Sequence, residues 1–283
     1  MQDELWLVVG DRFWQFAVDR KAITVSSLRG LLHSVRGTEL PPGKRMVLMI
    51  GQGVSDEDIA ELLAMAGRAP HAARFDFSRW QWRPKRASGY VSHKLRVENI
   101  LLSEARRVDD RNFAMSLMLD DHCELMMDHQ TGRHLAGVVL IEAVRQSLLV
   151  VTEGHYLQRD GRKHDFTFHD LTVKFHRYCF PFATELFYTV REMAVRGNRY
   201  SFHVDVRIVQ CDTVVLTAVA HMTAHVSASL SKIEGEQATR SLDHYLSSVV
   251  MAAESAARLE DTQTSEVAAL TVTQTEMEVM EES

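Results

Sequence analysis

The residues from Met126 to Val151 read MMDHQTGRHLAGVVLIEAVRQSLLVV, and this stretch decides how the rest of the chain is interpreted. From Leu135 onward, apolar residues fall on nearly every face of a helix, so the helix must be buried. Glu142, Arg145 and Gln146 interrupt it at spacings of three and four residues, which places them on one face. An unpaired buried charge is costly, so these groups form either a satisfied network or a functional site.

A loop just upstream of this helix carries Asp128 and His129. A carboxylate on a buried helix that faces a histidine from the preceding loop can divide general acid and general base work with it. A buried carboxylate of this kind is expected to have a raised pKa, near neutrality. The alternative is an internal ion pair between Glu142 and Arg145, with the histidine in solvent. The spacing leaves both interpretations open.

The segment DHQTGRHLAGVVLIEAVRQ, residues 128–146, resembles the hotdog-fold domain of the A-factor biosynthesis (AfsA) family, whose signature has the form DHxTGxHxxGxxLIEAxRQ. Upstream, residues Val91 to Val108 are similar to the first strand of that domain. The resemblance covers about residues 88 to 230 and occurs once, whereas well-known members carry two repeats. It implies an α+β fold in which a curved antiparallel sheet wraps around residues 135–151.

The same segment is similar, more distantly, to the FabZ-type 3-hydroxyacyl carrier-protein dehydratases. In that comparison His129 falls on the dehydratase histidine and Glu142 on its acid. Arg145 has no counterpart there. The arginine and the pair Thr131-Gly132 therefore favour the A-factor family.

The activity that the resemblance implies is transfer of a β-ketoacyl group from a carrier protein to the hydroxyl of a small, dihydroxyacetone-phosphate-like acceptor. Such a step would lead to a butyrolactone-like signal or another secondary metabolite. Transfer needs a base, here Glu142 or His129, and donors for the thioester oxyanion. Arg145 is expected to hold an acceptor phosphate or Glu142 itself. The residues expected to contact the substrate besides these are Asp128, Thr131, Gly137, whose helix-terminal N–H would bind the oxyanion, and Gln146.

Three alternatives stay open. A dehydratase would use His129 and Glu142 to remove a proton from Cα and protonate the leaving hydroxyl, and a thioesterase would direct a water instead. A non-catalytic acyl-binding or scaffold protein is the third. No cofactor is implied beyond an acyl group linked to phosphopantetheine or CoA. Because one hotdog unit leaves the site and a sheet edge without a partner, a homodimer is expected.

Length and composition limit the remaining possibilities. With 283 residues and 46% hydrophobic content, the chain can form a substantial core, and a net charge of −6 gives no general reason to bind nucleic acid. No apolar run approaches the roughly 20 residues that span a bilayer. The acidic start lacks the layout of a signal peptide, and three cysteines without a close pair fit reduced thiols. We expect a cytoplasmic protein with no membrane span.

Residues 1–78 are predicted to form a small α/β domain of unknown role. Residues 5–9 and 13–18 look like a hairpin, residues 45–50 like a strand, and Ser55 like the start of a helix. The turn Gly51-Gln52-Gly53 could cradle a phosphate at that helix. It lacks the third glycine of a dinucleotide fingerprint and the lysine of a P-loop, so an ordinary turn is favoured.

Residues 79–94 form a basic connection with two tryptophans and no acidic residue. They could dock an acidic carrier protein, a phosphate or a single-stranded nucleic acid, or they could be a solvated linker.

The hotdog domain is assigned to residues 95–250. Strands are predicted at residues 95–102 and 112–119 before the central helix, and at 166–175, 185–193, 200–208 and 214–226 after it. A last helix is predicted at residues 242–257, so it extends past the assigned end of the domain at residue 250. Residues 251–283 are expected to form an acidic, mostly disordered tail. Histidines, acids and a cysteine gather at residues 121–134, but their spacing matches no common zinc pattern, and no metal is expected.

Overall fold

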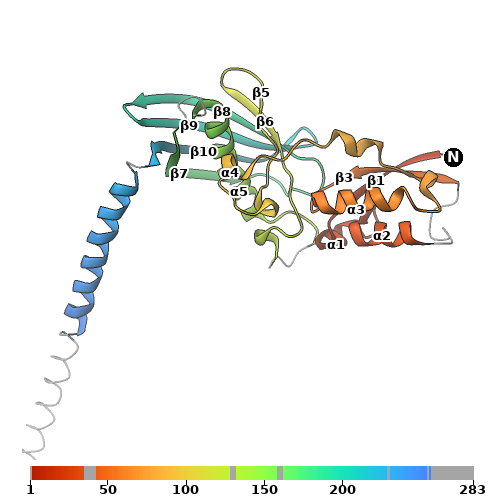
Figure 1. Cartoon of the computed structure of the whole chain (residues 1–283), viewed down its shortest axis with the longest axis horizontal. Helices are drawn as coiled ribbons and strands as arrows, with labels where there is room; N and C mark the ends of the chain where they lie inside the picture. The colour runs from red at the N-terminus through yellow and green to blue at the C-terminus, as the bar shows by residue number, and fades with distance from the viewer. Residues whose placement is uncertain are drawn as a thin grey trace, which may run out of the picture. The chain divides into compact units, whose positions relative to one another are not determined.

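The computed structural model describes residues 2–34, 43–127, 132–157, 162–227, 230–253 and 255 (Figure 1). The chain separates into two units, residues 1–225 and 226–283. The first contains a small α/β domain and a larger antiparallel domain, and the second is a single helix where it is described.

The α/β domain is built on a parallel sheet in which four strands lie in the order β2-β1-β3-β4. The strands are β1 (Gln2–Val9), β2 (Ala22–Thr24), β3 (Lys44–Ile50) and β4 (Phe75–Asp76). Helices α2 (Val25–His33) and α3 (Asp56–Ala66) share one apolar core with the sheet. Ser55 and Asp58 form a reciprocal capping box at the start of α3. The predicted α/β domain and this helix start are confirmed.

The predicted hairpin at residues 5–18 is wrong. After β1 the chain forms a 3₁₀ turn, Asp11–Phe13, and the short helix α1 (Trp14–Ala17), and β2 then pairs with β1 in parallel. The apolar residues Phe13, Phe16 and Ala17 are spaced three and four residues apart, which fits one face of a helix. All three pack against the core of the antiparallel domain.

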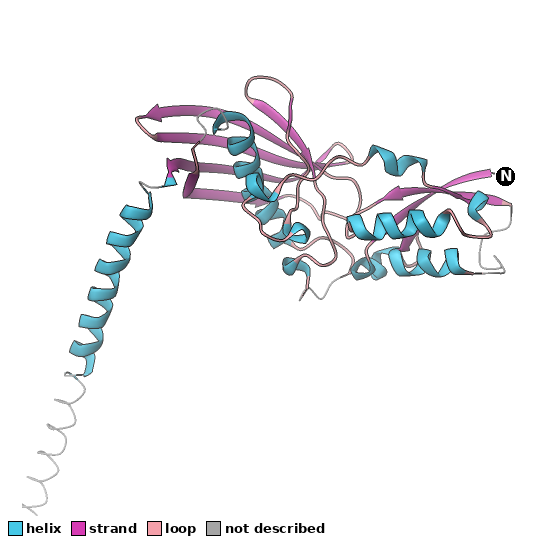
Figure 2. Cartoon of the chain, in the orientation of Figure 1, coloured by secondary structure: helices cyan, strands magenta, loops and turns pink. Residues whose placement is uncertain are grey.

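The second domain is a sheet of six strands in the order β5-β6-β8-β9-β10-β7 (Figure 2). Its strands are β5 (Arg106–Arg107), β6 (Asn112–Ser116), β7 (His164–Phe175), β8 (Glu185–Arg196), β9 (Arg199–Gln210) and β10 (Thr213–Val226). Helix α5 (Gly137–Val151) packs on it, and apolar side chains of the helix and of the sheet form one core. The predicted α+β hotdog arrangement is confirmed.

Burial along the sheet follows the predicted alternation. In β9, the side chains of Phe202, Val204, Val206 and Ile208 are buried while their neighbours are more exposed. The strand predicted at residues 95–102 is wrong. Leu95 is fully exposed, residues Val97–Asn99 form a 3₁₀ turn, and Leu102 makes only an isolated bridge.

The two domains meet where β3 ends. The buried side chain of Gln52 accepts a hydrogen bond from the N–H of Leu119 (2.7 Å) and donates one to the carbonyl of Leu117 (3.0 Å). The N–H of Gly53 donates to the carbonyl of Leu119 (2.9 Å). The glycine turn is therefore paired with the hotdog domain.

Asp121 fills the space beside this turn. Its Oδ1 lies 2.3 Å and 2.4 Å from where a Cβ on Gly10 and on Gly53 would be, so both positions need glycine. Its Oδ2 accepts from the N–H of Arg12 (3.0 Å), while Oδ1 has no hydrogen-bond partner within the described part of the chain. Burial raises the pKa of Asp121 to about 6, a hydrogen bond from the Arg12 backbone opposes this rise, and the nearby charge of Asp11 adds to it.

We expect Asp121→Asn to stabilise the protein, and more so at pH 8 than at pH 4.5. The folded-state pKa of about 6 lies above the ordinary 3.8, so the folded protein holds this proton more tightly than the unfolded chain. The stability that Asp121 contributes is full at low pH and is lost as the pH rises through 6. The amide carries no charge, so denaturant unfolding at pH 8 should show a gain of roughly 1–3 kcal/mol.

Asp110→Asn is the control, because the side chain of Asp110 is almost fully exposed. It should change the free energy of unfolding little at either pH. A destabilised Asp121→Asn variant at pH 8 would show that the ionised carboxylate is well solvated, contrary to this expectation.

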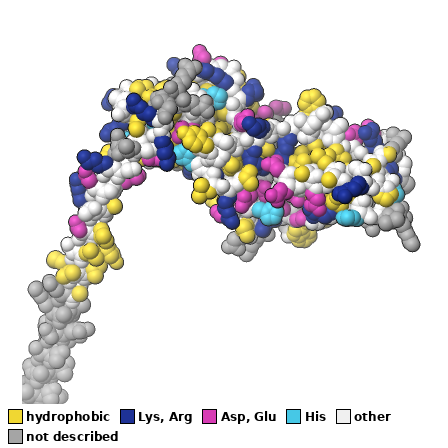
Figure 3. All heavy atoms as spheres, in the orientation of Figure 1, with side chains coloured by type: hydrophobic (Ala, Val, Ile, Leu, Met, Phe, Trp, Pro, Cys, Tyr) yellow, Lys and Arg dark blue, Asp and Glu magenta, His cyan; other side chains and the backbone are white. Residues whose placement is uncertain are grey.

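The second unit contains a helix over residues 230–253, which begins earlier than the predicted residue 242. Large hydrophobic side chains gather along it (Figure 3), and they are Leu242, Tyr245, Leu246, Val249, Val250 and Met251. Most of the predicted acidic tail, from residue 256 onward, lies outside the described residues. Among the helices in the described part of the chain, none is long and apolar enough to cross a membrane.

Candidate functional site

The polar cluster of α5 forms a closed network around Glu142. Arg145 donates to both carboxylate oxygens, from Nε to Oε2 (2.7 Å) and from Nη2 to Oε1 (2.8 Å). Lys94 Nζ lies 2.8 Å from Oε1, and Gln146 Nε2 donates to the same oxygen (3.0 Å). The ion pair within the helix, which the sequence left open, is present.

The network keeps Glu142 ionised. Burial raises the pKa of Glu142, but the hydrogen bonds from Arg145, Lys94 and Gln146 together lower it to about 2. The expectation of a raised pKa near neutrality is therefore wrong. It accounted for the burial of the carboxylate but not for its cationic partners, which favour the charged form.

Lys94 is a member of this network that the sequence did not indicate. It ends the basic connection, where helix α4 (Gly89–Ser92) packs beside α5 and the N–H of Lys94 donates to the carbonyl of Gly89 (3.1 Å). A Cβ on Gly89 would lie 2.4 Å from the Lys94 carbonyl, so the turn depends on glycine. Only the fold brings this lysine to Glu142, which lies 48 residues later in the sequence. No spacing rule could have paired them.

Gln146 joins the network to the segment before β5. The side chain is fully buried. Its Oε1 accepts from the N–H of Leu101 (2.9 Å), and its Nε2 donates to the carbonyl of Asn99 (2.8 Å) as well as to Glu142. These bonds use backbone groups that a strand at residues 95–102 would need, which explains why that strand does not form.

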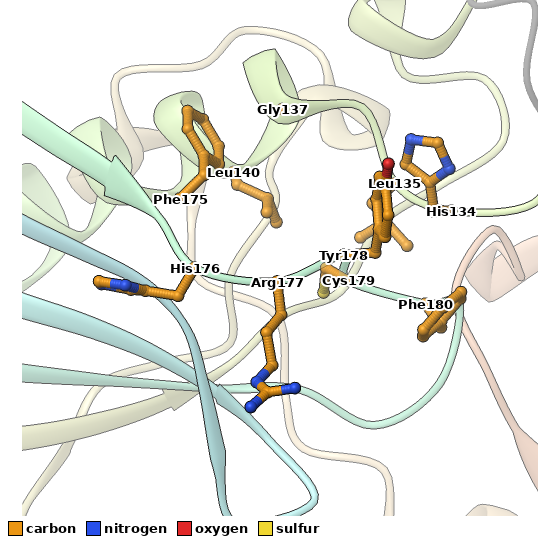
Figure 4. Close-up of a pocket in the computed structure, with 10 residues that line it drawn as sticks. All are labelled: His134, Leu135, Gly137, Leu140, Phe175, His176, Arg177, Tyr178, Cys179 and Phe180. Carbon is orange, nitrogen blue, oxygen red and sulfur yellow. The ribbon is translucent and has the colours of Figure 1, made fainter.

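Two cavities adjoin the start of α5. The smaller, of about 180 Å³, lies beside Glu142 and is lined by Lys94, Asn99, Cys123, Glu124, Leu125, Val138, Ile141 and Glu142. The larger, of about 700 Å³, is lined by His134, Leu135, Gly137 and Leu140 on one side and by residues 175–180 on the other (Figure 4). Its volume is in the range of small-molecule sites, about 300–1,000 Å³.

The larger cavity is mainly aromatic and apolar. The rings of His134 and Tyr178 lie 4.8 Å apart, and Phe175 faces Gly137 at the start of the helix (Figure 4). A Cβ on Gly137 would approach the Phe175 ring to 3.3 Å. Gly137, the predicted oxyanion donor, thus lies at the wall of this cavity.

The remaining predicted site residues, Asp128, His129 and Thr131, lie outside the described residues. Their described neighbours Met127 and Gly132 are both bonded to the α/β domain. In the ranges that the structure describes, no group of three or more histidine, cysteine or acidic side chains could hold a metal ion.

A long antiparallel sheet packed around one central helix is the arrangement of the hotdog fold. The chain belongs to the A-factor biosynthesis hotdog (AfsA) family, whose model matches residues 81–227. In the comparison with curated proteins, none matches this chain.

Solved structures with similarity to the chain include a dehydratase and a thioesterase. The dehydratase heterocomplex ApeI:P from Xenorhabdus doucetiae is 17% identical, with 53% of this chain and 98% of that one covered and a TM-score of 0.42. A mutant of the thioesterase PA1618 from Pseudomonas aeruginosa is 12% identical, with 47% and 88% covered and a TM-score of 0.35. The PaaI protein of Escherichia coli is 14% identical, with 43% and 81% covered and a TM-score of 0.32.

We expect Gln146→Met to destabilise the protein by roughly 2–4 kcal/mol, because two backbone groups, at Asn99 and Leu101, would each lose a buried partner. Denaturant unfolding measures this loss. Ser147→Ala is the matched control, since the equally buried Ser147 hydroxyl donates only to the Val144 carbonyl of its own helix (2.7 Å). Equal losses in the two variants would contradict a bridging role for Gln146.

Proposed function

We propose that the chain is an acyl-thioester enzyme that transfers a β-ketoacyl group from an acyl carrier protein, or from CoA, to the hydroxyl of a small acceptor. Membership of the A-factor biosynthesis family supports this class of reaction. The observation that carries the proposal is the ionised Glu142, held by Lys94 and Arg145 beside a cavity at the start of α5.

The thioester is proposed to bind at the start of α5, with its acyl chain in the larger cavity, its carbonyl oxygen near Gly137, and the acceptor in the smaller cavity beside Glu142. Backbone N–H groups at a helix N-terminus stabilise the negative charge that develops on that oxygen. The acceptor oxygen attacks the carbonyl carbon, its proton passes to a base, and the C–S bond breaks. The carrier thiol then leaves with a proton.

The low pKa of Glu142 bears on the choice of base. A carboxylate with a pKa of about 2 is a weak base near pH 7. His129 is therefore the better candidate for the base, and Glu142 the better candidate for an ionised group that orients its neighbours. An acceptor that draws Lys94 or Arg145 away from Glu142 would raise this pKa and make the carboxylate more basic.

Product analysis tests the proposal. The purified protein is incubated with β-ketoacyl and 3-hydroxyacyl carrier-protein thioesters, with and without a phosphorylated ketone or triol acceptor, and products are identified by mass. An acylated acceptor supports transfer. Loss of water from the 3-hydroxyacyl thioester would identify a dehydratase, free acid a thioesterase, and unchanged thioester a binding protein.

We expect Glu142→Gln to lower kcat roughly 100-fold, because the groups that this carboxylate orients would shift, while circular dichroism shows an intact fold. The amide keeps the volume and some hydrogen bonds, but it removes the charge that Lys94 and Arg145 neutralise. Glu104→Gln is the control, because Glu104 makes an exposed ion pair with Lys85. Full activity in a folded Glu142→Gln variant would exclude a role for this carboxylate.

Arg145→Lys separates two roles for the arginine. Its paired hydrogen bonds to Glu142 favour an orienting role, and a lysine cannot reproduce that fork. We expect kcat to fall roughly 10- to 100-fold with phosphorylated and unphosphorylated acceptors alike. An increase in KM confined to the phosphorylated acceptor would instead assign Arg145 to the phosphate.

The proposed enzyme is a homodimer. Strand β7 ends the order of described strands in the hotdog sheet, and Phe168 and Phe175 on it are exposed. A second copy added along β7 would cover this edge. Light scattering should show twice the chain mass at micromolar concentration, and an active monomer would contradict the dimer.

A further inference from the structure

The α/β domain has the topology in which ligands usually bind at one place. The chain leaves β1 toward β2 and then crosses to β3 on the other side of β1. In open parallel sheets, ligands occupy the crevice outside the carboxyl ends of the strands at such a switch point. Here those ends lead into Gly10 and into the turn Gly51-Gln52-Gly53.

In this protein the crevice is occupied by the hotdog domain. Gln52 and Gly53 bond to the backbone of residues 117–119, and the carboxylate of Asp121 lies against Gly10 and Gly53. In a doubly wound domain, a ligand would bring a charged group to this crevice. Here the Asp121 carboxylate of the same chain takes that place.

Arg12 holds both ends of one hotdog segment. Its Nε donates to the carbonyl of Asp121 (2.8 Å), its Nη1 to the carbonyl of Met127 (3.3 Å), and its backbone N–H to the Asp121 carboxylate (3.0 Å). Close by, the N–H of Phe16 donates to the carbonyl of Gly132 (3.0 Å). A Cβ on Gly132 would lie 2.5 Å from the Arg12 carbonyl, so the two segments touch there.

The segment between the carbonyls of Asp121 and Met127 forms a wall of the candidate site. Cys123, Glu124 and Leu125 line the cavity beside Glu142, together with Val138 and Ile141 of α5. The N–H of Glu124 is further fixed by the side chain of Asn99 (3.0 Å). Arg12 therefore sets where this wall stands relative to Glu142, although the guanidinium is not among the groups that line the cavity.

We propose that Arg12 is a positioning residue for the acyl-thioester site, and that the α/β domain serves to hold residues 121–127 against α5. This inference rests on the proposed function for its catalytic consequence. Its structural part, that Arg12 fixes residues 121–127, does not depend on the reaction.

The test compares Arg12→Gln and Arg12→Lys with Arg20→Gln. Arg20 lies in the same domain, but its Nη1 donates to the carbonyls of Phe16 and Val18, both 3.0 Å away and both within that domain. Hydrogen exchange of the amides at residues 121–127 and steady-state kinetics of acyl transfer are measured, together with the melting temperature.

Both Arg12 variants should exchange faster at residues 121–127 than the wild type, with exchange in β8 to β10 unchanged. Their kcat should fall roughly tenfold or more while KM for the thioester changes less, because misplacement of a site wall acts mainly on the reacting geometry. Arg12→Lys keeps the charge but cannot reach two carbonyls, so its defect should match that of Arg12→Gln. Arg20→Gln should resemble the wild type in both measurements.

Other outcomes separate the two proposals. If the wild type forms no transfer product, the proposed function fails, while the exchange data still decide whether Arg12 fixes the wall. If Arg12→Gln does not fold, Gly132→Ala disturbs the same contact from the hotdog side and should give the same local rise in exchange. If the Arg12 variants match Arg20→Gln in exchange and in kcat, the positioning role is overturned.

Discussion

The ionised carboxylate of Glu142 inside the face of a buried helix is the constraint around which the hotdog domain is arranged. Removing a carboxylate from water costs several kcal/mol, and partial burial alone would favour the neutral acid. Arg145 and Lys94 reverse that preference and bring the pKa to about 2. A helix that carries such a carboxylate can pack in the core only if cationic and amide side chains lie within hydrogen-bonding distance of it.

One of those partners comes from a segment that is far away in the sequence. Arg145 and Gln146 lie one turn along the same helix, but Lys94 arrives from the basic connection. Gln146 then takes the backbone of Asn99 and Leu101, so the segment before β5 is shaped by the network and not by a strand partner. The irregular path of residues 94–101 is thus a consequence of satisfying a single buried acid.

This dependence explains what the sequence could and could not predict. Local signals were sufficient for α5, for the alternating strands β7 to β10 and for the Ser55 cap, because periodicity and capping act within a few residues. The charged face of α5 was visible from its spacing. The false hairpin at residues 5–18 and the false strand at residues 95–102 arose where a distant domain or side chain decides the conformation. Lys94 and Asp121 lie in segments that the sequence singled out, but no local signal paired Lys94 with Glu142 or Asp121 with Gly10 and Gly53.

Asp121 and Glu142 show how partners decide the state of a buried acid. Both are largely removed from water, yet the pKa of Asp121 rises to about 6 and that of Glu142 falls to about 2. Glu142 receives two cationic side chains, whereas the Asp121 carboxylate receives a backbone N–H from Arg12 and lies near the like charge of Asp11. The Arg12 guanidinium bonds instead to the carbonyls of Asp121 and Met127. The arginine at the domain contact is thus committed to fixing the backbone beside the site, which leaves the Asp121 carboxylate poorly compensated. The Asp121 carboxylate therefore lowers the stability of the contact between the domains. In return, the Arg12 side chain fixes the position of residues 121–127 beside the site.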